Sequence, residues 1–179
     1  MTFKRMNKLN FLLVAIVALF SFSCIENDEI IYEKSVVEFD AATWNAKSVV
    51  DGVAKNYTLL TRRPNYGQLV STSNPAITRA SGTITLRVNL VGPHRPEQTE
   101  VAYKIVAEET TAVAGTHYSP LAGKVTIPAN SSFGEVSIPI LNPGVSSTTA
   151  VRLVLELVGN ENLPANENYK RIGISINQQ

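Results

Sequence analysis

The chain has 179 residues, among them 16 Lys and Arg, 15 Asp and Glu, and a single Cys. This length fits one domain with appendages, and a hydrophobic fraction of 44% argues against bulk disorder. A net charge of +1 excludes a strongly basic nucleic-acid binder, and one Cys excludes both an intrachain disulfide and a cysteine-based zinc site.

The N-terminus has the three-part layout of a secretory signal. Lys4, Arg5 and Lys8 precede an unbroken apolar run over residues 11–20, and small residues follow. As a helix this run spans about 15 Å, half of the roughly 30 Å hydrocarbon core of a bilayer. We therefore expect a cleaved signal peptide over residues 1–23; the alternative, a buried core helix, has no expected helical partner downstream.

The lone cysteine, Cys24, lies where this signal would be cut. The stretch Ser21-Phe22-Ser23-Cys24 resembles the loose lipobox of Bacteroidetes-type lipoproteins, with Ser21 where Leu is usual. The resemblance implies that Cys24 is lipidated and anchors the chain to the bacterial outer membrane, since each buried CH₂ group contributes about 0.8 kcal/mol. An incidental cysteine near an ordinary cleavage site is the alternative.

Residues 24–34 are expected to form a tether. Three acids in residues 25–29 resemble the export tag of surface-exposed Bacteroidetes lipoproteins, and a plain solvated tether explains them equally well. Cleavage would remove Lys4, Arg5 and Lys8 but no acid, which leaves a slightly acidic chain. Nothing in that charge recruits the domain to nucleic acid or anionic lipid.

The first third of the remaining chain is irregular. Residues 36–39 predict a strand, residues 41–50 are ambiguous with a helical option, and residues 57–61 and 68–71 suggest a hairpin around residues 62–67.

From about residue 82 onward, apolar and polar residues alternate with a period of two, the pattern of half-buried strands. In residues 83–90 every even position is apolar, and similar rows occupy 101–105, 125–127, 136–140, 151–157 and 172–176. Turn-forming residues separate these rows, and Pro139 within one of them indicates an edge strand or a bulge. We therefore predict an all-β fold over residues 35–179, an antiparallel β-sandwich of about seven to nine strands.

A family resemblance lies at residues 114–141. Ala114-Gly115-Thr116-His117-Tyr118, then residues 123–128 and 132–140, resemble the Calx-β pattern of immunoglobulin-like sandwiches. The segment is also similar to Calx-β-like domains of uncharacterised Bacteroidetes surface lipoproteins encoded near glycan-uptake systems. The resemblance implies an immunoglobulin-like fold, and it says little about function.

The departures from that pattern argue against a metal. Calcium needs about six to eight oxygen ligands, usually from clustered acids. Here His117 stands where the pattern has Asp, and the loop over residues 141–149 holds no acid. We expect no metal and no cofactor. His94 and His117 are the only histidines, and neither has a third ligand or a nucleophile near it in sequence, so we expect His117 to bond the backbone at a corner and Tyr118 to be buried there.

Ligand-binding candidates come from the first third of the domain. Trp44, Tyr57 and Tyr66 are candidates for a platform on which a sugar ring stacks, and Arg62 and Arg63 beside Tyr66 are candidates for recognising a carboxylate. Core packing for Trp44 and a solvated loop for the arginines are the plainer interpretations.

No catalytic motif is evident, so we expect a protein that is not an enzyme. The first hypothesis is a lipid-anchored binding or accessory module of an outer-membrane system, with glycan acquisition suggested by analogy alone. The second is a structural or adhesion domain that pairs a partner through a strand edge. The third, a hydrolase, requires two carboxylates about 5–10 Å apart in one cleft.

Overall fold

The computed structural model describes residues 34–43 and 47–179, all within the unit Tyr32–Gln179. The predicted signal segment 1–23, the lipidation site Cys24 and the aromatic candidate Trp44 lie outside the described residues, as does the predicted tether except Lys34. Among the described residues, no helix has the length and apolar character needed to cross a membrane.

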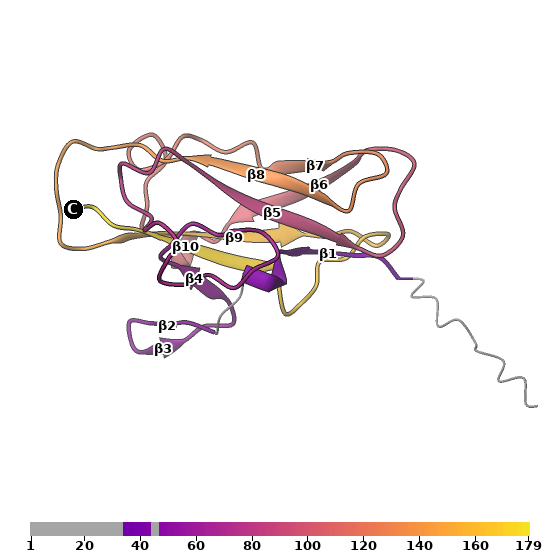
Figure 1. Ribbon diagram of the computed structural model, residues 1–179, viewed down its shortest axis with the longest axis horizontal. Helices are drawn as coiled ribbons and strands as arrows, with labels where there is room; N and C mark the ends of the chain where they lie inside the picture. Colours follow the sequence, from indigo (N-terminus) through magenta and orange to yellow (C-terminus); the bar gives the residue numbers. More distant parts are fainter. Residues whose placement is uncertain (1–33, 44–46) are drawn as a thin grey trace, which may run out of the picture. The chain divides into compact units, whose positions relative to one another are not determined.

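Two sheets make up the domain (Figure 1). The three-stranded sheet has the order β1 (Val36–Phe39), β5 (Thr83–Val91), β8 (Phe133–Pro139). The five-stranded sheet has the order β4 (Thr58–Leu60), β10 (Arg171–Ile176), β9 (Val151–Val158), β6 (Thr99–Ile105), β7 (Lys124–Ile127). A small hairpin pairs β2 (Val49–Val50) with β3 (Val53–Ala54), and short 3-10 turns occupy Ala41–Thr43 and Ala107–Glu109.

The strand order is that of an immunoglobulin-like sandwich. β1, β5 and β8 take the places of strands A, B and E, while β6, β9 and β10 take those of C, F and G. Apart from β4, which runs parallel to β10, every strand pair in the two sheets is antiparallel. The predicted all-β, immunoglobulin-like sandwich is therefore confirmed.

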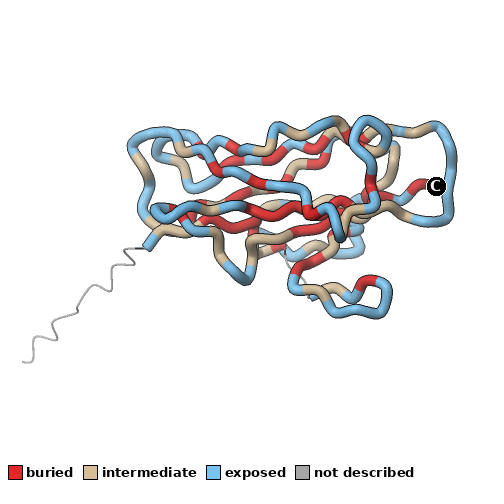
Figure 2. The backbone as a smooth tube through the Cα atoms, turned by 180° about the vertical axis from the view of Figure 1, so that it is seen from behind, coloured by how far each residue is buried: buried red, intermediate tan, exposed pale blue. Residues whose placement is uncertain are grey.

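The alternation seen in the sequence places one apolar row of each strand between the sheets. In β5 the buried residues are Ile84, Leu86, Val88 and Leu90, and the intervening positions reach the outer surface. Leu86 lies opposite Val136 of β8, so both strands turn their even-numbered side chains inward. Figure 2 shows the buried residues running along the strands and the exposed ones gathered in the loops. A shift of one residue would expose a whole row, which fixes the register.

The hairpin suggested for the first third was wrong. Residues 57–61 do not form a hairpin with 68–71; β4 instead pairs in parallel with β10, and residues 68–71 are not in a strand. In the ambiguous stretch 41–50, the described residues hold one 3-10 turn at Ala41–Thr43 and the short strand β2. The turn from β2 to β3 is Asp51-Gly52, and both residues have positive φ, 51° and 77°, as a two-residue type I′ turn requires.

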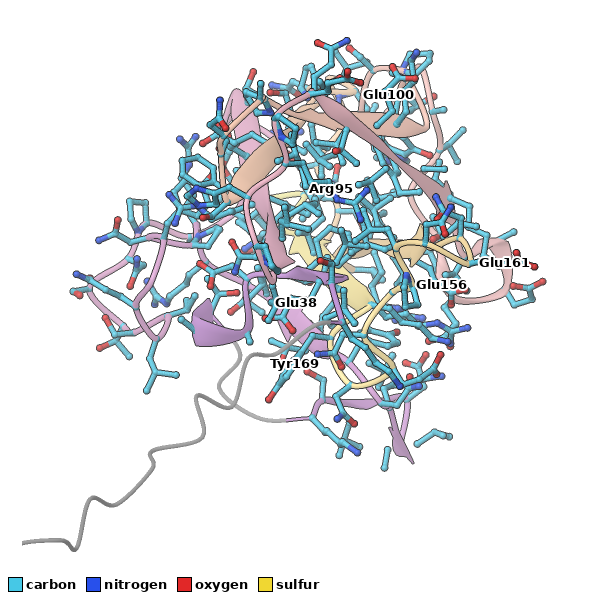
Figure 3. All side chains as sticks on the ribbon, turned by 90° about the vertical axis from the view of Figure 1, so that its right-hand side faces the viewer. Glu38, Arg95, Glu100, Glu156, Glu161 and Tyr169 are labelled. Carbon is cyan, nitrogen blue, oxygen red and sulfur yellow. The ribbon has the colours of Figure 1, made fainter. Side chains whose placement is uncertain are left out.

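Backbone contacts cover the β1 edge of the three-stranded sheet and one end of its β8 edge. Phe39 and Val37 of β1 donate backbone hydrogen bonds to the carbonyls of Tyr169 and Pro164, so the segment 164–169 covers that edge. Figure 3 labels Glu38 and Tyr169, which belong to this edge. β8 is the other edge strand, as Pro139 predicted, and the Pro139 carbonyl accepts a hydrogen bond from Ser119.

Candidate binding site on the three-stranded sheet

A cation lies over two aromatic rings on the outer face of the three-stranded sheet. The Arg87 guanidinium carbon is 3.9 Å from the centroid of the Phe133 ring and 4.7 Å from that of Tyr66. Both distances fall within the range of cation–π attraction. The Phe133 side of this site reaches solvent, since that residue is 37% exposed. We call these three residues the Arg87 site.

Strand register explains why Arg87 and Phe133 meet. Odd-numbered positions of β5 and β8 face outward, and Asn89 lies directly opposite Phe133. Arg87 is therefore the diagonal neighbour of Phe133, at a spacing that long and aromatic side chains can bridge.

Tyr66 reaches the same face from the loop that follows β4. The Asp40 carboxylate accepts a 2.9 Å hydrogen bond from the backbone N–H of Gly67. It also accepts a 3.1 Å hydrogen bond from the backbone N–H of Ala42. Burial, with the charge of Glu135 adding to it, raises the pKa of Tyr66, so the phenol stays neutral at physiological pH. The hydrogen bond from Gly67 to Asp40 thus anchors the loop that carries Tyr66 over Arg87.

The guanidinium keeps its hydrogen-bonding capacity. Its Nε is buried without a hydrogen-bond partner, and in the part of the chain that the structure describes no ion pair includes Arg87. Glu135 lies directly across from it on β8, yet the two form no ion pair. An exposed ring face beside a cation without a carboxylate partner can stack a flat ligand and pair with an anionic group.

Arg62 and Arg63 do not join Tyr66, contrary to the prediction. Arg62 Nη1 donates a 2.6 Å hydrogen bond to the Asn74 carbonyl and lines a surface hollow of about 400 Å³ with Thr148 and Asn177. The Arg63 carbonyl accepts a hydrogen bond from Asn74, and its side chain borders a second shallow hollow. The Arg62 side chain is therefore engaged with the Asn74 carbonyl, and the cation over the Tyr66 ring is Arg87 of β5.

Tyr57 is a core residue and not an exposed platform. Its ring is 0% exposed and packs with Val106 and Val154 in a small cluster separate from the main core. Its hydroxyl donates a 2.5 Å hydrogen bond to Glu109. The expectation that Tyr57 stacks on a ligand is therefore corrected, because burial of the whole ring leaves no face for a sugar.

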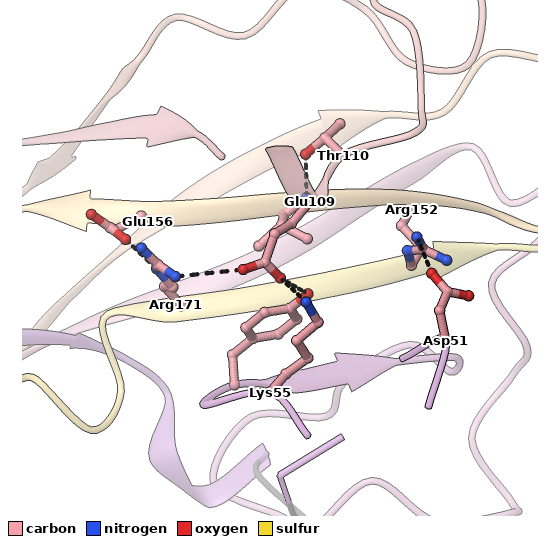
Figure 4. Close-up of polar contacts among 9 residues, drawn as sticks. Asp51, Lys55, Glu109, Thr110, Arg152, Glu156 and Arg171 are labelled. Atoms are coloured by element: carbon pink, nitrogen blue, oxygen red, sulfur yellow. Dashed lines mark hydrogen bonds and ion pairs between the residues drawn. The ribbon is translucent and has the colours of Figure 1, made fainter. Parts of the chain in front are cut away.

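Tyr57 also belongs to an ion-pair network around β9 and β10 (Figure 4). The Glu109 carboxylate lies 3.3 Å from the Lys55 ammonium nitrogen and 3.6 Å from Arg171 Nη1. Arg171 also forms an ion pair with Glu156, whose carboxylate lies 3.1 Å from the Lys104 ammonium nitrogen. We call Lys55, Tyr57, Lys104, Glu109, Glu156 and Arg171 the Glu109 network.

The two carboxylates of this network stay ionised. Burial alone would raise the pKa of Glu109, but hydrogen bonds from Tyr57 and Lys55 and the charge of Arg171 outweigh it and lower the pKa. For Glu156, Arg171 and Lys104 likewise outweigh burial and lower the pKa. A glycosidase acid needs a raised pKa so that it carries a proton, and neither Glu109 nor Glu156 meets that requirement.

The histidines and Tyr118 have structural contacts. His117 Nδ1 accepts a 2.9 Å hydrogen bond from the backbone N–H of Val113, which confirms the predicted backbone contact at this corner. The ring of Tyr118 is buried, as predicted. His94 Nε2 lies 2.6 Å from the Ser132 hydroxyl. Over residues 34–43 and 47–179, no group of three or more His, Cys, Asp or Glu side chains is placed to hold a metal ion.

The sequence did not lead us to name Arg87 and Phe133 as ligand-binding candidates, although the outward-facing position of each in its strand pattern is a signal. Phe133 is an aromatic residue in the outward-facing register of its strand, where a polar side chain is usual, and Arg87 is outward in β5. Their adjacency required the pairing of β5 with β8, which alternation within either strand does not specify.

The comparisons with known proteins add the family and structural neighbours. A family model described as "Domain of unknown function (DUF4843)" matches residues 71–179. No curated protein matches the chain. Two solved structures, titled CBD12 from CALX1.2 and the calcium binding domain CBD12 of CALX1.1, are each 18% identical over 56% of this chain, with TM-scores of 0.47 and 0.48.

A third structure, titled the apo form of the Calx CBD1 domain, is 17% identical with a TM-score of 0.45; the match covers 56% of this chain and 88% of that one. The match covers only 39% and 40% of the two CBD12 structures.

Proposed function

The chain belongs to the DUF4843 family of domains of unknown function, and from that premise we propose that it is a non-catalytic binding module of the bacterial cell envelope. The Arg87 site is its ligand-binding surface, and its ligand is a saccharide. The observation that carries this proposal is the partly exposed Phe133 ring beside a guanidinium that no carboxylate neutralises.

The chemistry of the Arg87 site suits a sugar. The flat face of a pyranose carries C–H groups that pack on an aromatic ring, while its hydroxyls need hydrogen-bonding partners at the rim. Phe133 offers the ring, and Arg87 and Asn89 offer donors beside it on β5. Because the sheet holds Arg87 and Phe133 and Asp40 holds the Tyr66 loop, little ordering is required on binding.

In this proposal the module is held on the outer membrane, facing the cell exterior, by lipid on Cys24, and it serves as an accessory protein in glycan acquisition. The apolar run over residues 11–20 and the single cysteine that follows it support the anchor. No enzymatic activity and no cofactor form part of the proposal. Trp44 remains a candidate for an additional stacking contact.

A structural or adhesion role through strand edges is the second candidate. Part of β8 favours it. The odd-numbered residues of this strand turn their backbone groups away from β5, and those of Glu135 and Ser137 have no covering strand in the described chain. The ends of the same edge are closed, since Ser131 bonds the N–H and carbonyl of Phe133 and Ser119 bonds Pro139. We therefore rank this role below saccharide binding.

Binding of the full chain, purified in detergent, to a glycan array tests the proposal. We expect binding to at least one class of saccharide, and a loss of about tenfold or more in Phe133→Ala. Val158→Ala is the matched control, because Val158 has a similar exposure but lies on β9 in the other sheet. An array on which no member binds, or on which both variants bind as the wild type does, would contradict the proposal.

A further inference from the structure

We infer that the ligand of the Arg87 site is an acidic saccharide, whose carboxylate pairs with the guanidinium while its sugar ring lies on Phe133. This inference rests on the proposed function and names its ligand class. It follows from three features: the guanidinium donors without a hydrogen-bond partner, the absence of an ion pair to Arg87 among the described residues, and the backbone groups of Phe133 that are already bonded.

The stacked arrangement leaves the guanidinium donors at its edge. Phe133 and Tyr66 contact Arg87 through their ring faces, and rings accept no in-plane hydrogen bond from the guanidinium. Nε is buried and has no partner, and no hydrogen bond or ion pair within residues 34–43 and 47–179 ends on the terminal nitrogens. Those nitrogens form the planar pair of donors that binds a carboxylate through both of its oxygens.

Among the described residues, no acid forms an ion pair with Arg87. Glu135 is opposite on β8 but forms no ion pair with it. Asp40 uses both carboxylate oxygens on other groups, with Oδ2 bound to the Gly67 N–H and Oδ1 bound to the Ala42 N–H and, at 3.5 Å, to Asn89. A cation stacked between two rings, with no ion-pair partner of its own, can pair with the anionic group of a ligand.

The surroundings favour a saccharide over an acidic peptide. An extended peptide would bind by pairing its backbone with a strand edge. Beside the ring, the backbone N–H and carbonyl of Phe133 are already bonded to the Ser131 hydroxyl, so this position offers no backbone partner. What remains is a partly exposed aromatic side chain beside guanidinium donors without a hydrogen-bond partner, which matches a sugar ring carrying a carboxylate.

Pairs of oligosaccharides that differ only in the carboxylate test the inference. The full chain in detergent is titrated with oligogalacturonate and, separately, with its methyl ester. On a glycan array, the binding of each uronate and each sialate is compared with the binding of its ester. We expect the acid form to bind about tenfold more tightly in low salt, and this preference to shrink as salt is raised. Arg87→Met keeps much of the side-chain packing, and it is expected to bind acid and ester equally.

Two further variants keep the test decisive. Glu135→Gln removes the carboxylate opposite Arg87 without touching the stack, and it is expected to tighten acid binding several-fold while ester binding stays unchanged. Arg152→Met, on β9 of the five-stranded sheet, removes a positive charge outside the Arg87 site and should match the wild type. Esters that bind as tightly as their acids would overturn the inference and leave the proposed function standing. If neither form of any pair binds, and neutral glycans do not bind either, both fail.

Discussion

At the scale of single residues, Gly134 sets how closely two strands approach. A Cβ atom at this position would lie 2.4 Å from the Thr126 carbonyl oxygen and 3.0 Å from Val125 Cγ2. Real Cβ atoms essentially never come so near a backbone oxygen, so β7 and β8 can approach as they do only if residue 134 has no side chain. Here the glycine is required by space and not by a positive φ.

Gly134→Ala is therefore expected to destabilise the fold by about 2 kcal/mol or more, because backbone and not a flexible side chain must move. Denaturant unfolding of the full chain measures the change. Ser137→Ala, an exposed position on the same strand, is the control and should stay within about 0.5 kcal/mol of the wild type. Equal midpoints for the two variants would show that β7 and β8 are not packed this closely.

Glu38 is a second residue whose surroundings decide its behaviour. It is 8% exposed on β1, where burial and the charge of Asp40 raise its pKa even though the Asn166 amide donates it a 2.6 Å hydrogen bond. An acid whose folded pKa is raised binds a proton more readily in the native state. Stability from this group is therefore present at low pH and is lost as pH rises through the raised pKa.

Glu38→Gln should stabilise the protein at pH 7 by a few tenths to about 1 kcal/mol, since glutamine keeps an oxygen for Asn166 and carries no charge. The gain should disappear below the ordinary carboxyl pKa of 4.5, where Glu38 is protonated in both folded and unfolded chains. Unfolding midpoints at pH 7 and pH 3.5 measure both statements. A variant less stable than the wild type at pH 7 would be inconsistent with the burial argument.

At the scale of elements, the Glu109 network attaches the chain before β4 to the five-stranded sheet. Lys55 and Tyr57 come from that segment, Glu109 from the 3-10 turn after β6, and Arg171 from the start of β10. Tyr57 packs on β10 where Gly173 leaves space, because a Cβ there would lie 3.0 Å from its ring. Distant parts of the sequence thus meet on one sheet face.

Glu109→Gln should cost about 2 kcal/mol at pH 7, because it removes the carboxylate that Tyr57, Lys55 and Arg171 share. The folded pKa of Glu109 is lowered, so its stabilisation is complete above pH 4.5 and is lost as pH falls through that lower value. The difference from the wild type should therefore shrink in acid.

Glu108→Gln is the matched control for this measurement, since Glu108 is adjacent and exposed. It should change stability by less than about 0.5 kcal/mol at either pH. A loss as large for Glu108→Gln as for Glu109→Gln would mean that net charge, and not the network, determines the effect.

At the scale of the whole molecule, the domain is proposed to act while attached to a membrane. One sandwich supplies the binding surface, and the chain before it would supply the attachment through Cys24. Two or more acyl chains give stable anchoring where a single chain gives only reversible binding.

Metabolic labelling with an alkyne analogue of palmitate tests the attachment in a bacterial host that processes lipoproteins. The wild-type chain should be labelled and recovered with membranes, and Cys24→Ala should lose the label because the chain has no other cysteine. Ser21→Leu restores the usual residue of the lipobox and should be labelled at least as well as the wild type. An unlabelled wild type recovered away from membranes would refute the anchor.

The sequence by itself determined the fold class and most strands. Period-two alternation predicted the strands that became β5 through β10, and β1 was predicted as a short strand, because a half-buried strand must place its apolar residues on one face. The contact of His117 with the backbone and the edge position of Pro139 also followed from local chemistry. Such features depend on residues close in the sequence.

Only the tertiary structure decided the binding surface and the path of the first third. Tyr57 became core and Arg62 bonded the Asn74 carbonyl, while Arg87 and Phe133 met because β5 pairs with β8. β4 joined β10 in parallel, across more than a hundred residues of chain, where no local pattern could select the partner. The physical reason is that local sequence decides which face of a strand a side chain occupies. The residues that it contacts on that face depend on which strand pairs with its own, and that pairing is long-range.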